Sequence, residues 1–186
     1  NSPKAEERIN LTGSVQKRYN NVKTSFTLRA NKNTSYNIVN DDLRRFDYLT
    51  QFGRASIATN FKAAPNVELG YSYNINRSKD DDQVLHYITE RPFVSVDAAF
   101  LNGFIFLATY SFFDYRQGST SLNTYDDFTM SLVYQKKDSP WELSVQGNNV
   151  LGNESINRDN FSGIAQNTTL YMIQPRYIYF MLKYIL

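Results

Sequence analysis

Residues 168–186 read TTLYMIQPRYIYFMLKYIL, and the last ten positions decide the fold. Their side chains alternate between two sets. The set with even numbers is apolar or aromatic and consists of Ile178, Phe180, Leu182, Tyr184 and Leu186. The other set mixes Lys183 and two tyrosine hydroxyls with apolar groups. A period of two residues is typical of a β-strand. An apolar strand with an open edge promotes association in water, so we expect this one to be fully paired or to lie in a closed sheet.

Length and composition leave two fold classes for residues 1–186, which we expect to form a single domain. No run approaches the roughly 18 apolar residues of a transmembrane helix, and this excludes a helical membrane protein. The chain contains 14 Tyr and 13 Phe. Aromatic residues concentrate at the two membrane interfaces of transmembrane β-barrels. The composition therefore favours a membrane barrel over a soluble β protein.

The inventory of reactive side chains argues against an enzyme. The net charge is +2 with acids and bases interspersed, and this gives no reason to expect a nucleic-acid partner. There is no cysteine, and the single histidine, His86, falls in a predicted polar loop, so neither a catalytic triad nor a thiolate or imidazole metal site can be assembled. Residues 80–82 are three aspartates, but no glycine-centred Ca²⁺-ligand spacing follows them, which favours a charged loop tip. We expect no catalytic residue, no metal and no cofactor.

The remainder of the chain reads as a series of amphipathic strands, about nine in all with the last one. Their length suits tilted membrane strands better than the five or six residues usual in soluble sheets. Asn102-Gly103 is the strongest hairpin signal, and Gly53 is a candidate bulge. The expected strands cover residues 8–19, 22–31, 43–62, 67–76, 87–100, 104–112, 127–135, 141–148 and 169–186.

The reversals between these strands alternate in length. Short ones are predicted at residues 19–21, 63–66, 102–103 and 138–140, and longer loops at 77–86, 117–124 and 152–167. Outer-membrane barrels have short periplasmic turns and longer external loops. With a periplasmic C-terminus, the odd strand count places Asn1 outside, whereas a barrel that closes alone has an even count. We therefore expect the first strand to pair with a strand upstream of these residues.

The chain resembles the C-terminal part of a TonB-dependent outer-membrane receptor barrel of the type abundant in Bacteroidetes. Residues 141–151, WELSVQGNNVL, are similar to the penultimate strand of that family and its Asn-Asn-Val-Leu element. Residues 171–186 resemble its closing strand, where the usual last residue is Phe and this chain has Leu186. In outer-membrane barrels the assembly machinery reads this strand, so the resemblance assigns an assembly signal to Phe180, Leu182, Tyr184 and Leu186.

The resemblance also implies a larger architecture and a function. Family members form a 22-stranded barrel in the bacterial outer membrane, filled by an N-terminal plug that TonB engages. The chain would then be barrel wall of a transporter that takes up a substrate. Its partners would be outer-membrane lipid, the upstream strands and plug, TonB through that plug, and a surface lipoprotein. Two alternatives stay open. One is a small self-closing barrel or a secretion or adhesion pore; the other is a soluble β-sandwich, which must cover its apolar faces with a second sheet.

The alternation assigns side chains to the two faces of the wall. A wide barrel needs a polar wall in any case, so the lumen-lining set does not by itself predict a solute site. The predicted lipid-facing residues are Phe26, Leu28, Leu69, Tyr71, Phe106, Leu132, Leu143, Phe180 and Leu182. The predicted lumen-lining residues are Lys23, Arg29, Arg54, Glu68, Gln146 and Lys183.

Overall fold

The computed structural model describes residues 5–184 except 40, 63–64, 81–82, 102, 137–138, 154, 163–164 and 173–175. Residue 39 and the strands within residues 155–172 are described by their backbone alone. All regular structure in these residues is β-strand. None of the described segments is a helix that could cross a membrane. The strands are β1 Glu7–Tyr19, β2 Val22–Val39, β3 Asp42–Thr59, β4 Asn66–Lys79, β5 Val84–Phe100, β6 Phe104–Gln117, β7 Thr120–Gln135, β8 Trp141–Asn148, β9 Ser155–Ser162, β10 Ala165–Met172 and β11 Tyr177–Tyr184.

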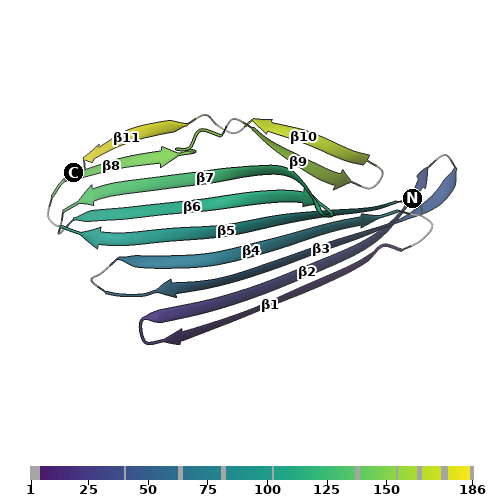
Figure 1. Ribbon diagram of the computed structural model, residues 1–186, viewed down its shortest axis with the longest axis horizontal. Helices are drawn as coiled ribbons and strands as arrows, with labels where there is room; N and C mark the ends of the chain where they lie inside the picture. The colour runs from purple at the N-terminus through teal and green to yellow at the C-terminus, as the bar shows by residue number, and fades with distance from the viewer. Residues whose placement is uncertain are drawn as a thin grey trace.

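Nine of these strands form one antiparallel sheet in the order β1-β2-β3-β4-β5-β6-β7-β8-β11 (Figure 1). Strands adjacent in the sequence are neighbours in the sheet up to β8. Strands β9 and β10 form a separate two-stranded sheet, and β11 then returns to pair with β8. The expectation of an all-β, antiparallel fold is confirmed.

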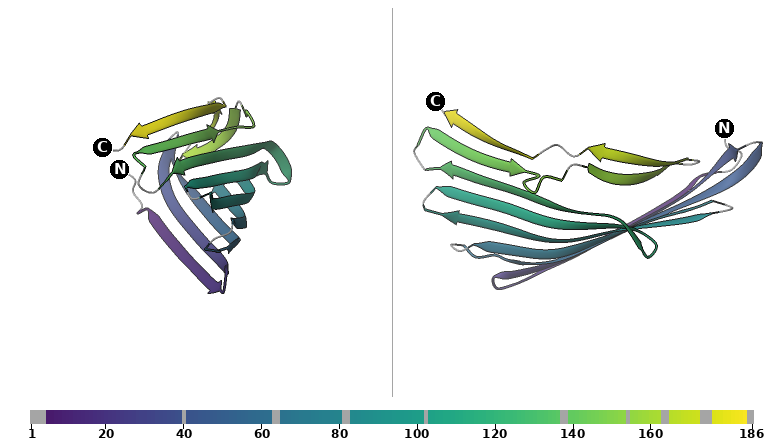
Figure 2. Two further views of the ribbon diagram at one scale, coloured as in Figure 1. Left: turned by 90° about the vertical axis from the view of Figure 1, so that its left-hand side faces the viewer. Right: turned by 45° about the horizontal axis from the view of Figure 1, so that its top comes forward.

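The sheet curls into an open trough, as the view along its strands shows (Figure 2). Its two edges are β1 and β11. In the described part of the chain, β1 pairs with β2 and β11 with β8, and the two edges do not pair with each other. This curled antiparallel sheet is consistent with a β-barrel-like fold, and in the described residues its first and last strands each offer an unpaired backbone edge.

Two of the predicted long loops are wrong. Strand β4 runs to Lys79 and β5 begins at Val84, so His86 lies on a strand. Only Gly118 and Ser119 separate β6 from β7, and Gly118 has the positive φ of +59° that favours glycine in tight turns. Polar residues extend these strands because a neighbouring strand supplies backbone partners whatever the side chains are. Loop length therefore does not alternate as predicted.

Three further expectations also need correction. The predicted loop at residues 152–167 contains β9 and the start of β10, and the last strand begins at Tyr177 instead of near residue 169. Gly53 is not a bulge, because the pairing of β3 with β2 and with β4 is continuous through it. A Cβ there would lie 3.5 Å from Leu28 Cδ2, so the glycine accommodates a packed neighbour. A register shift occurs instead between Tyr115 and Arg116.

Candidate functional site

The register divides the nine-stranded sheet into two faces. Directly paired residues share a face, and one row of pairs crosses every strand. Thr59 and Val67 adjoin in this row through the bond from Val67 N to Thr59 Oγ1. The row consists of Tyr19, Val22, Thr59, Val67, Val96, Ala108, Met130, Gly147 and Ile178. We call the side that carries this row the apolar face and the opposite side the polar face. All nine predicted lipid-facing residues lie on the apolar face, including Phe180 and Leu182.

On β2, β3 and β4 the apolar face is more exposed than the polar face, which inverts the arrangement of a water-soluble sheet. On β6 the order is reversed, since Ile105 and Leu107 of the polar face are exposed and Phe106 is half-buried. Along β4, exposed Leu69 and Tyr71 alternate with half-buried Glu68 and Ser72. Leu69 is 54% exposed. The buried apolar side chains of the described residues, Phe46, Tyr87 and Phe93, belong to the polar face. Within the described residues no second layer covers the apolar face.

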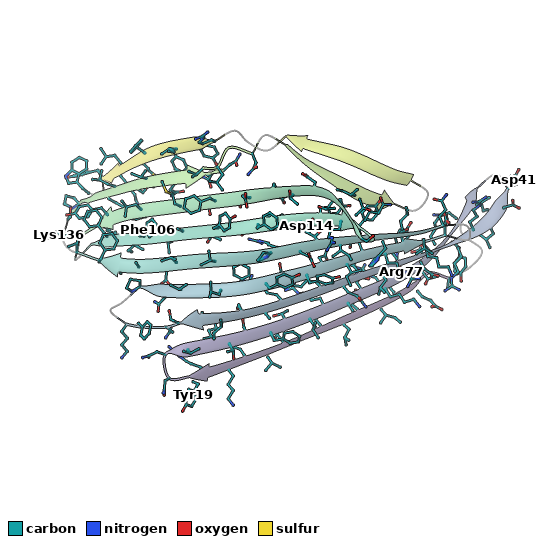
Figure 3. The ribbon with its side chains drawn as sticks, in the orientation of Figure 1. Tyr19, Asp41, Arg77, Phe106, Asp114 and Lys136 are labelled. Carbon is teal, nitrogen blue, oxygen red and sulfur yellow. The ribbon has the colours of Figure 1, made fainter. Side chains whose placement is uncertain are left out.

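Aromatic side chains mark one end of the apolar face. The Phe100 and Phe104 rings stack with centroids 5.7 Å apart, and Phe104 lies 4.7 Å from Tyr134. Trp141 and Tyr184 make a second pair at 4.7 Å. We call this the near end; Figure 3 shows Tyr19, Phe106 and Lys136 toward it. The far end holds the turns between β2 and β3, β4 and β5, and β6 and β7, and Asp41 and Arg77 lie toward it in Figure 3.

The boundary between apolar and charged side chains crosses the apolar face diagonally. Counted from the common row toward the far end, the first charged residue comes ten residues along β2 and β4, twelve along β3, six along β5 and β6, and four along β7. These residues are Lys32, Arg77, Asp47, Glu90, Asp114 and Asp126. The edge strand β1 does not follow this trend, since Lys17 lies two residues from Tyr19. From β2 to β7 the boundary shifts by six residues across five strand steps. At about 3.3 Å per residue and 4.8 Å per strand, the strands meet this boundary at a tilt of about 40°.

The six predicted lumen-lining residues all lie on the polar face, but in separate groups. Arg54 pairs with Glu68 at 3.1 Å, and Lys183 lies 3.8 Å from Glu142. The Tyr179 hydroxyl donates to Gln146 Oε1. Arg29 lies over the Phe52 ring at 5.7 Å, and Lys23 is at the near end of β2. The described residues therefore form a polar wall in which these groups do not converge on one point.

Sequence reasoning missed a stack of arginine and aromatic side chains at the centre of the polar face. Arg54 Cζ lies 4.5 Å from the Phe93 ring centroid, and Arg91 Cζ lies 5.0 Å from that of Phe113. Arg91 also donates to the Ser111 hydroxyl at 3.0 Å. Gly70 makes room for Phe93, because a Cβ at Gly70 would lie 2.2 Å from the ring. The sequence signal that could have revealed this stack is alternation: Arg91, Phe93 and Phe113 occupy the alternate positions of their strands that share a face with the polar residues of neighbouring strands.

Charged side chains extend the far end of the apolar face beyond its apolar residues. There Asp47 accepts hydrogen bonds from Thr34 at 2.7 Å and from Arg45 at 3.0 Å. Burial would raise the pKa of Asp47, but these two hydrogen bonds, together with the positive charges of Arg45 and Lys32, outweigh it and hold the pKa below its usual value. Asp47 therefore stays ionised and paired.

Some predicted positions lie outside the described residues. They include Leu186, at the end of the predicted assembly signal, and Asp81 and Asp82 of the aspartate loop. Among the residues that the structure does describe, no group of three or more histidine or acidic side chains could hold a metal ion. Comparison with known protein families, curated proteins and solved structures found no match.

Proposed function

We propose that this chain is part of the wall of a TonB-dependent transporter barrel in the bacterial outer membrane, with the apolar face toward lipid and the polar face toward the lumen. The observation that carries the proposal is the apolar face, which is the more exposed face over β2–β4 and is bounded along a diagonal from β2 to β7. Contiguous exposed apolar surface of this extent marks an interaction with lipid or another protein. A diagonal boundary is what a flat membrane interface produces on tilted strands.

The dimensions support lipid as the partner of this face. Strands of outer-membrane barrels tilt by roughly 35–45°, and the boundary corresponds to about 40°. On β6 the apolar residues run from Phe104 to Phe112. At about 3.4 Å per residue and that tilt, they cover about 20 Å along the membrane normal. The apolar band of such barrels is about 25 Å tall. The paired rings at the near end have the character of an interfacial girdle.

A larger barrel accommodates the edges and the polar face better than closure within this chain. Both β1 and β11 offer backbone donors and acceptors that need partners in lipid. Nine strands would enclose a lumen barely wide enough for side chains, whereas the polar face carries many charged groups. We infer that upstream strands complete the barrel and that a plug engages TonB, as the resemblance of residues 141–151 and 171–186 implies.

The long polar hairpins at the far end indicate how the sheet is oriented across the membrane. Strands β2 and β3, β4 and β5, and β6 and β7 continue past the apolar residues at the far end, and the β9–β10 hairpin is also there (Figure 1). Extended hairpins at the far end replace the long external loops predicted from the sequence, so we assign the far end to the cell exterior and the near end to the periplasm.

The test uses epitope tags in the full-length protein that contains this chain. A tag between Gly118 and Ser119 should bind antibody on intact cells, whereas one between Asn20 and Asn21 should do so only after the outer membrane is permeabilised. Crosslinking in the same cells should capture TonB. If antibody binds neither tag on intact cells, the proposed orientation is contradicted. Surface exposure without TonB capture would favour the alternative of a passive or self-closing barrel.

A further inference from the structure

We infer that the apolar face carries a binding site for an anionic lipid at β1–β4, with the lipid phosphate against Lys32, Arg77 and Lys79 and an acyl chain in the groove beside them. The inference rests on the proposed function, because lipid reaches this face only if it lies in a membrane. Two neighbouring features of the apolar face support the inference: an apolar groove and a depression lined by cations.

The apolar feature is a groove of about 500 Å³ across β1–β4. Its floor is open because Gly13 and Gly53 lack side chains. A Cβ at Gly13 would meet nothing within 4 Å. Neither glycine has a positive φ, so the space does not arise from a strained backbone. Its walls include Leu11, Leu28 and Ile75, side chains that suit a hydrocarbon chain.

The cationic feature begins at the next row toward the far end. Lys32 and Arg77 lie on either side of Leu49, two residues beyond Ala30 and Ile75 of the groove, and Lys79 follows on β4. The three cations line a second depression of about 190 Å³ together with Asp47, Tyr48 and Leu49. The groove and the depression are therefore contiguous on one face.

The balance of charge in this depression leaves room for an anion. Its acid, Asp47, is already paired with Arg45 at 3.0 Å. Within the described part of the chain, Lys32, Arg77 and Lys79 make no ion pair (Figure 3 labels Arg77). The other charged groups of this region are Glu7, in the row of Thr34, His86, opposite Arg77, and Asp80, which follows Lys79. The charge of Lys32 also acts on Asp47. The four cations of this region, Lys32, Arg77, Lys79 and Arg45, thus outnumber its acids, Asp47, Glu7 and Asp80.

The order of the two features matches a lipid instead of a soluble anion. From the near end toward the far end come hydrocarbon groove, interface and cations, which is the order of acyl chain and phosphate in a leaflet. Each basic side chain near a membrane surface strengthens attraction to an anionic head group by about fivefold. We therefore expect the site to prefer phosphatidic acid over phosphatidylcholine by at least that factor.

Tryptophan quenching by brominated lipids tests this in the full-length protein reconstituted into phosphatidylcholine vesicles. Trp141 is the only tryptophan of this chain and lies at the near end, away from the site. Any tryptophans elsewhere in the protein are replaced by Phe.

A second reporter, Ile9→Trp with Trp141→Phe, places the indole next to Lys32 on the apolar face. Dibrominated phosphatidic acid and dibrominated phosphatidylcholine are compared at equal mole fraction. The Ile9→Trp reporter should show a preference of about fivefold or more for phosphatidic acid, and Trp141 should show none.

Matched variants separate the two features of the site. Arg77→Gln with Lys79→Gln should abolish the preference, whereas Lys17→Gln with Arg18→Gln, which removes the same two residue types at the near end, should keep it. Gly13→Leu fills the groove without touching a cation and should lower the preference severalfold. If Gly13→Leu has no effect, or if millimolar inorganic phosphate removes the preference, the cations bind phosphate alone and the lipid site is refuted.

The two reporters also keep the two proposals apart. Equal quenching of both by both lipids would place the face in the bilayer and refute the anionic-lipid site. Absence of quenching at either reporter would refute the membrane assignment itself. Trp141 quenching in each variant shows that the variant has inserted.

Discussion

Arginine substitution at two adjacent residues of β6 should destabilise the protein at one residue and leave its stability nearly unchanged at the other. Phe106 lies on the apolar face between Ala98 and Leu132, one side chain in from Phe104 in the apolar run from Phe104 to Phe112. Leu107 lies on the polar face between Asp97 and Ser131, and it is 47% exposed. In water, both substitutions would be surface changes within about 0.5 kcal/mol of wild type. In a membrane barrel, only Leu107→Arg remains a surface change.

The expected magnitude follows from the surroundings of each side chain. Phe106→Arg places a guanidinium in hydrocarbon between the near-end interface and the midplane, where the cost in barrels of this kind lies between the roughly 0–1 kcal/mol of the interface and the roughly 2–4 kcal/mol of the midplane. Leu107→Arg places it in a water-filled or plug-filled lumen opposite Asp97, where an exposed ion pair contributes at most about 1 kcal/mol. We expect Phe106→Arg to lower the free energy of unfolding by about 1–3 kcal/mol, and Leu107→Arg to leave it nearly unchanged.

Urea titration of the protein refolded in lipid vesicles measures both values. The midpoint should fall for Phe106→Arg with an unchanged slope, since the same surface is exposed on unfolding. Equal losses for the two variants, or no loss at Phe106, would refute the assignment of the apolar face to lipid.

Three other predictions concern assembly, packing and the edge strands. Deleting residues 184–186 should leave the protein unassembled in the periplasm, because the closing pattern is lost; wild-type amounts of heat-modifiable barrel would contradict this. Gly70→Ala should cost about 1–3 kcal/mol by displacing Phe93, as overpacking does, whereas Gly13→Ala should change the free energy of unfolding by less than about 0.5 kcal/mol; urea midpoints decide. A cysteine pair at Gly13 and Leu182, on β1 and β11, should not form a disulfide in assembled protein, since each strand pairs elsewhere; a high yield would show closure of the barrel within this chain.

The sequence predicted the strands best where apolar residues alternate. The pattern from Val22 to Ala30 and from Val67 to Ile75 identified both faces, because lipid-facing and lumen-facing positions differ in polarity. The prediction of strands from alternation failed where the residues of both faces are polar. Residues 77–79 and His86 read as loop, yet each pairs with a neighbouring strand that the local sequence does not reveal.

The organisation of the faces beyond their polarity needed the register. The groove at Gly13 and Gly53 combines residues from strands far apart in the sequence, and no local pattern relates them. The same holds for the cations, because Lys32 and Arg77 adjoin only through Leu49 on the strand between them. Single-strand periodicity assigned each residue to a face but not to a position on it.

Spin-label scanning along β4 tests the central claim most directly. Single labels at residues 66–76 in vesicles report collisions with oxygen, which partitions into hydrocarbon, and with a water-soluble nickel chelate. The odd positions, Val67, Leu69, Tyr71, Tyr73 and Ile75, should favour oxygen, with a maximum near Tyr71, and the even positions should favour the chelate. Uniform access to the chelate at all eleven positions, or the opposite parity, would contradict the account.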